Sequence, residues 1–141
     1  MTVVYNKFNC FVADEANKVH NLGSDTLKVA LTDTLPVATN TVIANITEIA
    51  YTNITGGTTT GRNVTVTGST QTSGTYKLVA NQLTLTASGT VPQFRYVVLY
   101  NSTTASGNLI SWYDNGSEVN LNTGDSFVVG FDLTNGILQV A

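Results

Sequence analysis

The feature that most constrains the fold is the segment from Phe94 to Tyr100, the most apolar stretch of the chain. Alternate residues of a strand face opposite sides, so both faces of this segment can be read from its sequence. One face would carry Phe94, Tyr96, Val98 and Tyr100, and the other Arg95, Val97 and Leu99. Because both faces are apolar, we expect a central strand covered on each side, with Phe94, Tyr96, Val98 and Leu99 largely buried.

The rest of residues 24–141 alternates apolar and polar residues in short stretches separated by turn residues. Asn115-Gly116 and Asn135-Gly136 each stand between two such stretches, which is the strongest short-range signal of a hairpin. Asn53–Thr60 contains Gly-Gly and short polar residues and is predicted to be a flexible loop. The other expected strands are Thr26–Thr32, Asn63–Thr67, Thr75–Val79, Gln82–Thr86, Asn108–Tyr113, Ser126–Leu133 and Ile137–Val140, with Thr41–Ile49 as a strand or an irregular edge. This spacing predicts an antiparallel β-sandwich or jelly roll.

One segment has helical periodicity instead. Apolar residues recur there at three- and four-residue spacing: Tyr5, Phe8, Phe11, Val12, Ala16 and Val19. Asp14 and Lys18 form a favourable i,i+4 pair on the other side, and Gly23 is a common type of helix terminator. We therefore expect an amphipathic helix over residues 6–20, packed against a β-sandwich over 24–141. Residues 1–141 should form a single domain, because cores of about 100–150 residues are the commonest.

The surface chemistry narrows the classes of function. Charged residues make up only 11% of the chain, against roughly 25% in ordinary soluble domains, and 24 Thr and 15 Asn replace them. Such a surface is typical of proteins that pack against copies of themselves or against other proteins. The net charge of −3 and the scattered basic residues argue against nucleic-acid binding. No stretch approaches the roughly 18 apolar residues that cross a bilayer, and the N-terminus lacks the pattern of a signal peptide.

Few residues are suited to catalysis. His20 is the only histidine and Cys10 the only cysteine, so a structural role is favoured for the first and a half-buried position for the second. Asp114 and Glu118 flank an Asn-Gly turn and could be posed as the acid and base of a glycosidase. Carboxylates at a hairpin tip are ordinarily solvated, which favours the interpretation that Asp114 and Glu118 are surface residues without a catalytic role. We expect no enzymatic activity, no cofactor and no metal.

Aromatic residues offer a second candidate site. Trp112 and Tyr113, with Tyr96 and Tyr100 nearby in the pattern, could form a platform that stacks on sugars. A location in the β core or at a subunit interface is the favoured interpretation, because aromatic side chains dominate the energetics of both.

Several segments together resemble a family of small virion structural proteins from tailed bacteriophages. The segments that carry the resemblance span nearly the whole chain: Tyr5-Asn6-Lys7-Phe8 with Phe11-Val12, His20-Asn21-Leu22, Asp25–Thr32, Thr47-Glu48-Ile49, Thr72–Leu78, Phe94–Asn101, Ile110–Asp114 and Asn135-Gly136-Ile137. The resemblance implies a capsid decoration (cement) protein, made in the host cytoplasm and placed as homotrimers on the capsid exterior of the virion. Its partner would be the major capsid protein, and its role would be to bridge capsomers.

Two other functions remain open at this point. A tail-fibre or adhesin module would bind a receptor or glycan through Trp112, Tyr113 and loop amides. A polysaccharide depolymerase would use Asp114 and Glu118. The resemblance carries over no catalytic or binding residues.

Overall fold

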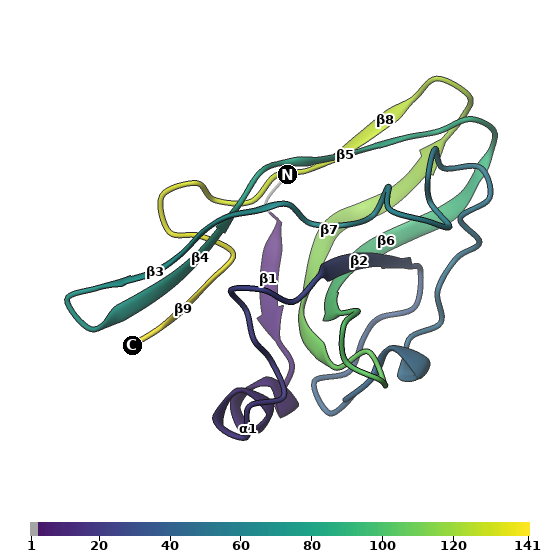
Figure 1. Ribbon diagram of the computed structural model, residues 1–141. Helices are drawn as coiled ribbons and strands as arrows, with labels where there is room; N and C mark the ends of the chain where they lie inside the picture. The colour runs from purple at the N-terminus through teal and green to yellow at the C-terminus, as the bar shows by residue number, and fades with distance from the viewer. Residues whose placement is uncertain (1–2) are drawn as a thin grey trace.

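The computed structural model describes residues 3–141 as a mainly β protein with antiparallel sheets and one short α-helix (Figure 1). The first sheet has the strand order β1-β7-β6-β2. Its strands are β1 (Val4–Lys7), β2 (Leu27–Thr32), β6 (Val91–Asn101) and β7 (Leu109–Leu121). The second sheet contains β3 (Val66–Thr72), β4 (Thr75–Ala80) and β9 (Leu138–Val140), and the third pairs β5 (Leu83–Thr86) with β8 (Ser126–Val129). The helices are α1 (Cys10–Ala16) and the 3-10 turn η1 (Ile43–Asn45).

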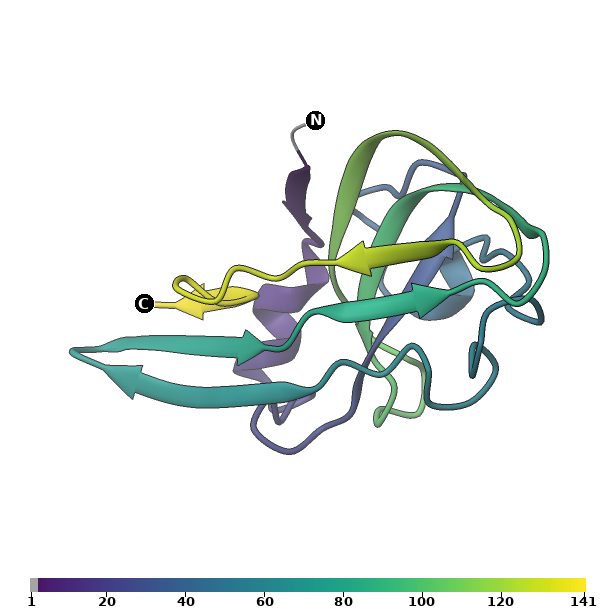
Figure 2. The same cartoon turned by 90° about the horizontal axis from the view of Figure 1, so that it is seen from above.

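The two smaller sheets lie over one face of the first sheet. Figure 2 shows β4 continuing in line into β5, and β8 leading towards β9 on the other side. The main core lies between these layers and includes Leu31, Val97 and Ile110 from the first sheet and Leu78 and Leu85 from the others. The mainly β, antiparallel architecture expected from the sequence is therefore confirmed. The jelly roll is not confirmed, because the second layer is divided into two small sheets.

Strand β6 is covered on both sides, as its sequence predicts. Phe94, Val98 and Leu99 are 0% exposed and Tyr96 is 8% exposed. The simple alternation breaks at Arg95, however, because the register with β7 shifts between Phe94 and Tyr96. Phe94 consequently lies in the main core, whereas Tyr96 and Val98 lie in a second core on the opposite face.

The predicted helix over residues 6–20 is wrong at both ends. Its first part is strand β1, which pairs with β7 so that Tyr5 lies opposite Tyr113. The helix begins only at Cys10 and ends at Ala16, and Lys18 has a left-handed φ of 62° that prevents its continuation. Val12, assigned to the apolar stripe, is 57% exposed. The β-forming sequence Val3-Val4-Tyr5 and the unpaired edge of β7 together favour a strand over another helical turn.

Neither Asn-Gly pair forms the expected hairpin. Strand β7 runs through Asn115-Gly116 as a bulge, in which residues 115–118 stand opposite Arg95 alone. Asn135-Gly136 lies in a turn, but the strands on either side of it, β8 and β9, pair with β5 and β4 and not with each other. The tight hairpin is instead at Ser73-Gly74, where φ values of 52° and 82° fit a type I′ turn between β3 and β4.

The segment Asn53–Thr60 lies outside the strands, as expected, but it is folded into consecutive turns. The amide of Gly57 donates to the carbonyl of Ile54, and that of Gly61 donates to Gly56, both at 2.8 Å. A Cβ on Gly57 would lie 2.6 Å from the carbonyl oxygen of Tyr51, so the close approach requires glycine. Within residues 3–141, no helix is long and apolar enough to span a bilayer.

Candidate functional site

Asp114, the first candidate for an acid or base, is held by the β7 bulge. Its carboxylate accepts two hydrogen bonds from Arg95, at 2.8 and 3.1 Å, and one from the amide of Gly116 at 2.7 Å. The hydrogen bonds from Arg95, followed by that from Gly116, lower the pKa of Asp114. A glycosidase acid needs a raised pKa. Asp114 thus lacks the raised pKa of a glycosidase acid, and Glu118 is exposed on the same strand.

His20 lies in a buried polar network that joins four parts of the chain. The Asn101 amide donates to Asp25 at 2.6 Å and to the Nδ1 atom of His20 at 3.0 Å. Since Nδ1 accepts a hydrogen bond, the proton of the neutral ring is on Nε2, which lies 4.0 Å from Asp14. Burial lowers the pKa of His20, although Asp14 and Asp25 oppose this shift. This geometry fits the structural role favoured from the sequence.

Cys10 is half-buried at the start of α1, and its Sγ lies 3.6 Å from the carbonyl oxygen of Leu109. Burial and the nearby Asp14 carboxylate raise the pKa of the Cys10 thiol. A nucleophilic cysteine needs the opposite shift. Residues 3–141 also contain no cluster of three or more His, Cys, Asp or Glu side chains arranged to hold a metal ion.

Trp112 and Tyr113 do not form an exposed platform. Trp112 is only 7% exposed, and its ring centroid lies 4.6 Å from that of Phe8 in the second core. Tyr113 packs between Tyr5 and Phe131 on the other face, and burial raises its pKa. Trp112 therefore lies in the core, as the favoured interpretation of the sequence expected, whereas Tyr113 is half-buried.

No pattern in the sequence indicates the cluster that forms around the buried Arg62. Arg62 is 7% exposed, its guanidinium carbon lies 3.7 Å from the ring centroid of Tyr51, and its Nε donates to Gly57 at 2.7 Å. The Tyr51 hydroxyl donates to Glu48 at 2.7 Å and accepts the amide of Leu31 at 2.9 Å. These residues come from irregular segments without periodicity, so no sequence signal brings them together. The contacts of this cluster hold residues 48–62 against β2.

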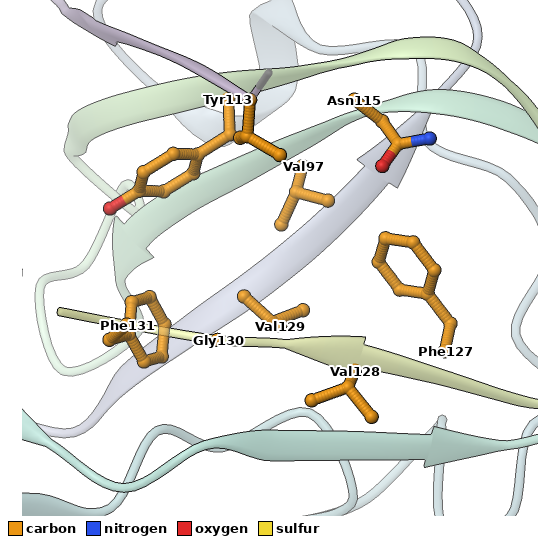
Figure 3. A pocket seen from close by; sticks show the side chains of 9 residues that line it. Val97, Tyr113, Asn115, Phe127, Val128, Val129, Gly130 and Phe131 are labelled. Atoms are coloured by element: carbon orange, nitrogen blue, oxygen red, sulfur yellow. The ribbon is translucent and has the colours of Figure 1, made fainter. Parts of the chain in front are cut away.

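One opening lined largely by apolar side chains lies beside β1. Two adjoining cavities of about 90 and 350 Å³ share Val3, Tyr113, Gly130 and Phe131. We call them together the β1 groove; it also includes Tyr5, Val97, Asn115, Phe127, Val128, Val129, Asp132, Gly136 and Ile137. Figure 3 shows the side chains of Phe127, Val129 and Phe131 turned toward Val97 and Tyr113, whereas Val128 points away. Among residues 3–141, Asp132 is the only charged residue that lines the groove.

A second opening is lined by both polar and apolar residues. A cleft of about 640 Å³ separates the α1 end from the β3–β4 hairpin, and Glu15, Lys18, His20, Ser69 and Tyr76 line it among others. Ser69 and Tyr76 are hydrogen-bonded to each other at 2.8 Å. The buried Oε2 of Glu15 and Nε2 of His20 have no hydrogen-bond partner among the described residues, yet each atom is inaccessible to a ligand. This cleft therefore offers no set of accessible polar groups that converge on a common ligand position.

Comparisons with known proteins identify no relative: no family model, no curated protein and no solved structure matches the chain. The function has to be argued from the surfaces and side chains described above.

Proposed function

We propose that this chain is a non-enzymatic structural protein of a tailed-bacteriophage virion, a capsid decoration protein that self-associates on the outside of the head. The observation that supports this proposal best is the contrast between the candidate reactive groups and the β1 region. Asp114 is held by Arg95, and His20 and Trp112 are buried. Val3 and Tyr5, in contrast, are 54% and 43% exposed at the edge of a sheet. This arrangement suits a contact surface better than a reaction site.

The composition of the surface supports the same function. With only 11% charged residues, the protein has few ionised groups to desolvate when it packs against another protein. Thr and Asn keep the surface polar and can form hydrogen bonds across an interface without a large electrostatic cost. A decoration protein needs a broad contact area of this kind.

Decoration stabilises a capsid through mass action. A protein that binds the assembled shell, and not its separated capsomers, shifts the equilibrium toward the assembled state. Clustered copies raise the effective concentration of each capsid contact, so weak individual contacts give a durable attachment. The partner in this proposal is the major capsid protein, and the family resemblance favours clusters of three.

The alternative of a glycan-binding tail module has less support. It relied on Trp112 and Tyr113 as stacking residues, but Trp112 is buried, and the half-buried Tyr113 lies on the opposite face of the sheet. A depolymerase has less support still, because the Asp114 carboxylate already accepts hydrogen bonds from Arg95 and from the Gly116 amide, and its lowered pKa does not suit a general acid.

The location of the protein in the particle tests the proposal. Electron microscopy of virions labelled with an antibody against this chain should show label distributed over the head. Label confined to the tail fibres would contradict the decoration function and favour receptor binding. Label at neither place would contradict a virion role.

A further inference from the structure

The two edges of the first sheet differ. The β2 edge is covered by the chain itself, because Leu31 accepts the amide of Ile49 at 3.0 Å and Leu27 accepts that of Val64 at 2.9 Å. The β1 edge has no neighbouring strand among residues 3–141, on the side away from β7 (Figures 1 and 2). An open edge presents backbone donors and acceptors that are available to another strand.

The register identifies which groups of β1 point outward. The amide of Phe8 donates to the carbonyl of Ile110 at 3.1 Å, so these residues form a hydrogen-bonded pair. Hydrogen-bonded and non-hydrogen-bonded pairs alternate along an antiparallel ladder. The backbone groups of Asn6 and Val4 therefore face β7, and those of Tyr5 and Lys7 face away from the sheet. The same alternation, continued to Val3 directly before the strand, places its backbone groups on the outward side.

Three side chains on the open edge, those of Val3, Val4 and Tyr5, are apolar. Val3 and Tyr5 line the β1 groove, and the Tyr5 ring packs edge-on against Tyr113 at a centroid distance of 5.5 Å. Val4, on the other face, is 51% exposed. An incoming strand would thus gain both backbone hydrogen bonds and apolar contacts, which is how strand addition achieves affinity.

We propose that the occupant of this edge is β1 of a second copy, paired antiparallel about a two-fold axis at Tyr5. In this register Tyr5 lies opposite Tyr5 of the second copy, and Val3 lies opposite Lys7 of the second copy. The first sheets of the two copies become one continuous sheet. A two-fold interface uses the same patch on both copies, and an antiparallel strand edge meets this requirement by itself.

Charge supports this occupant. Antiparallel pairing separates the two Lys7 side chains, which would lie side by side in a parallel arrangement. It also brings Lys7 of the second copy beside Val3, and Asp132 lines the same cavity as Val3 and Tyr5. Hydrogen bonds from Asn135 and Thr134 lower the pKa of Asp132, so its carboxylate is ionised at neutral pH. Each copy then places a basic residue near an acidic residue of the other.

This inference rests on the self-association in the proposed function, but not on the virion. A two-fold strand pair produces dimers, or joins three-fold clusters into hexamers. An assembly that contains three-fold contacts alone would lack the pair.

Replacement of Lys7 tests the pairing directly. Lys7→Pro removes an outward amide while the inward ladder to β7 stays intact, because proline is tolerated on an edge strand with its nitrogen toward solvent. Lys7→Ala is the matched control, since it loses the charge but keeps the amide. By sedimentation equilibrium over a concentration series, the unaltered chain should form dimers or hexamers. Lys7→Pro loses two hydrogen bonds per dimer and should weaken it at least about tenfold relative to Lys7→Ala.

Two results would overturn the proposal. One is an unaltered chain that stays monomeric at its highest soluble concentration or forms trimers only. The other is equal association of Lys7→Pro and Lys7→Ala.

Amide exchange measured by NMR gives a second readout that does not depend on a variant. The amides of Tyr5 and Lys7 should exchange more slowly as the protein concentration rises, whereas those of Val4 and Asn6 should be protected at every concentration. Exchange at Tyr5 and Lys7 that is independent of concentration would contradict the pairing.

Discussion

Replacement of Phe94 by alanine removes a ring that joins the two layers of the protein. Phe94 is 0% exposed in β6, and its ring meets that of Phe127 edge to face at a centroid distance of 5.1 Å and an angle of 88°. Phe127 belongs to β8, in the small two-stranded sheet. The substitution therefore leaves a cavity in the main core and removes an aromatic contact between layers.

The expected loss of stability follows from these contacts. Truncation of a buried Phe to Ala costs about 3–5 kcal/mol, because apolar surface is lost and the cavity closes only in part. The aromatic pair accounts for about 0.5–1.5 kcal/mol of this cost. At about 2–4 °C per kcal/mol, the melting temperature should fall by roughly 6–20 °C.

Urea unfolding followed by Trp112 fluorescence and circular dichroism measures this change. Phe94→Leu keeps most of the volume and should cost less than about 1.5 kcal/mol. Val128→Ala, at a site that is 49% exposed, should change stability by less than about 0.5 kcal/mol. If Phe94→Ala costs less than about 1 kcal/mol, Phe94 does not occupy the packed position described here.

Three further predictions concern single sites. Gly57→Ala should destabilise the protein by more than about 2 kcal/mol, because the added Cβ would meet the Tyr51 carbonyl oxygen. Gly74→Ala has nothing within 4 Å of the added Cβ, so it should cost only the strain of its φ of 82°, about 1 kcal/mol. Urea unfolding measures both changes. Because burial lowers the pKa of His20 from its usual 6.5, the unfolded chain binds the proton more readily, so stability should fall as pH drops below 6.5, and less so in His20→Gln. Incubation with host capsular and cell-wall glycans should release no saccharide, and release that disappears in Asp114→Asn or Glu118→Gln would show an enzyme.

The sequence predicts the central strand of the fold well and the chain reversals poorly. The run around Phe94 is decisive because a strand apolar on both faces has to be covered on both. The position of Phe94 itself was not predictable by alternation, since the bulge in β7 opposite Arg95 changes the phase. The position of a bulge depends on which strand pairs with which, and the sequence of one strand alone does not reveal its partner.

Local signals conflict at several turns. Asn115-Gly116 has a hairpin sequence, but Gly116 uses its φ of 87° within a continuous strand, where the carboxylate of Asp114 accepts its amide. Ser73-Gly74 forms the tight hairpin with a less common pair of residues. In both cases long-range strand pairing decides between turns that are locally similar in energy.

The N-terminal segment shows the same competition. Helical spacing around Phe8 and Phe11 is real, yet residues 4–7 lie in a strand because the edge of β7 offers hydrogen bonds to the backbone groups of Val4 and Asn6. Helical periodicity cannot register an available edge elsewhere in the chain. The β1 groove therefore could not be predicted from sequence patterns, because it forms only when strand β1 is placed beside Phe131.

The most direct test of the proposed function compares phage particles with and without this protein. Particles that lack it should release DNA at a lower temperature than complete particles, and purified protein added back should restore the difference. Adsorption to host cells should be unchanged. Particles of unaltered heat stability that fail to adsorb would contradict decoration of the capsid and would establish a role in receptor binding.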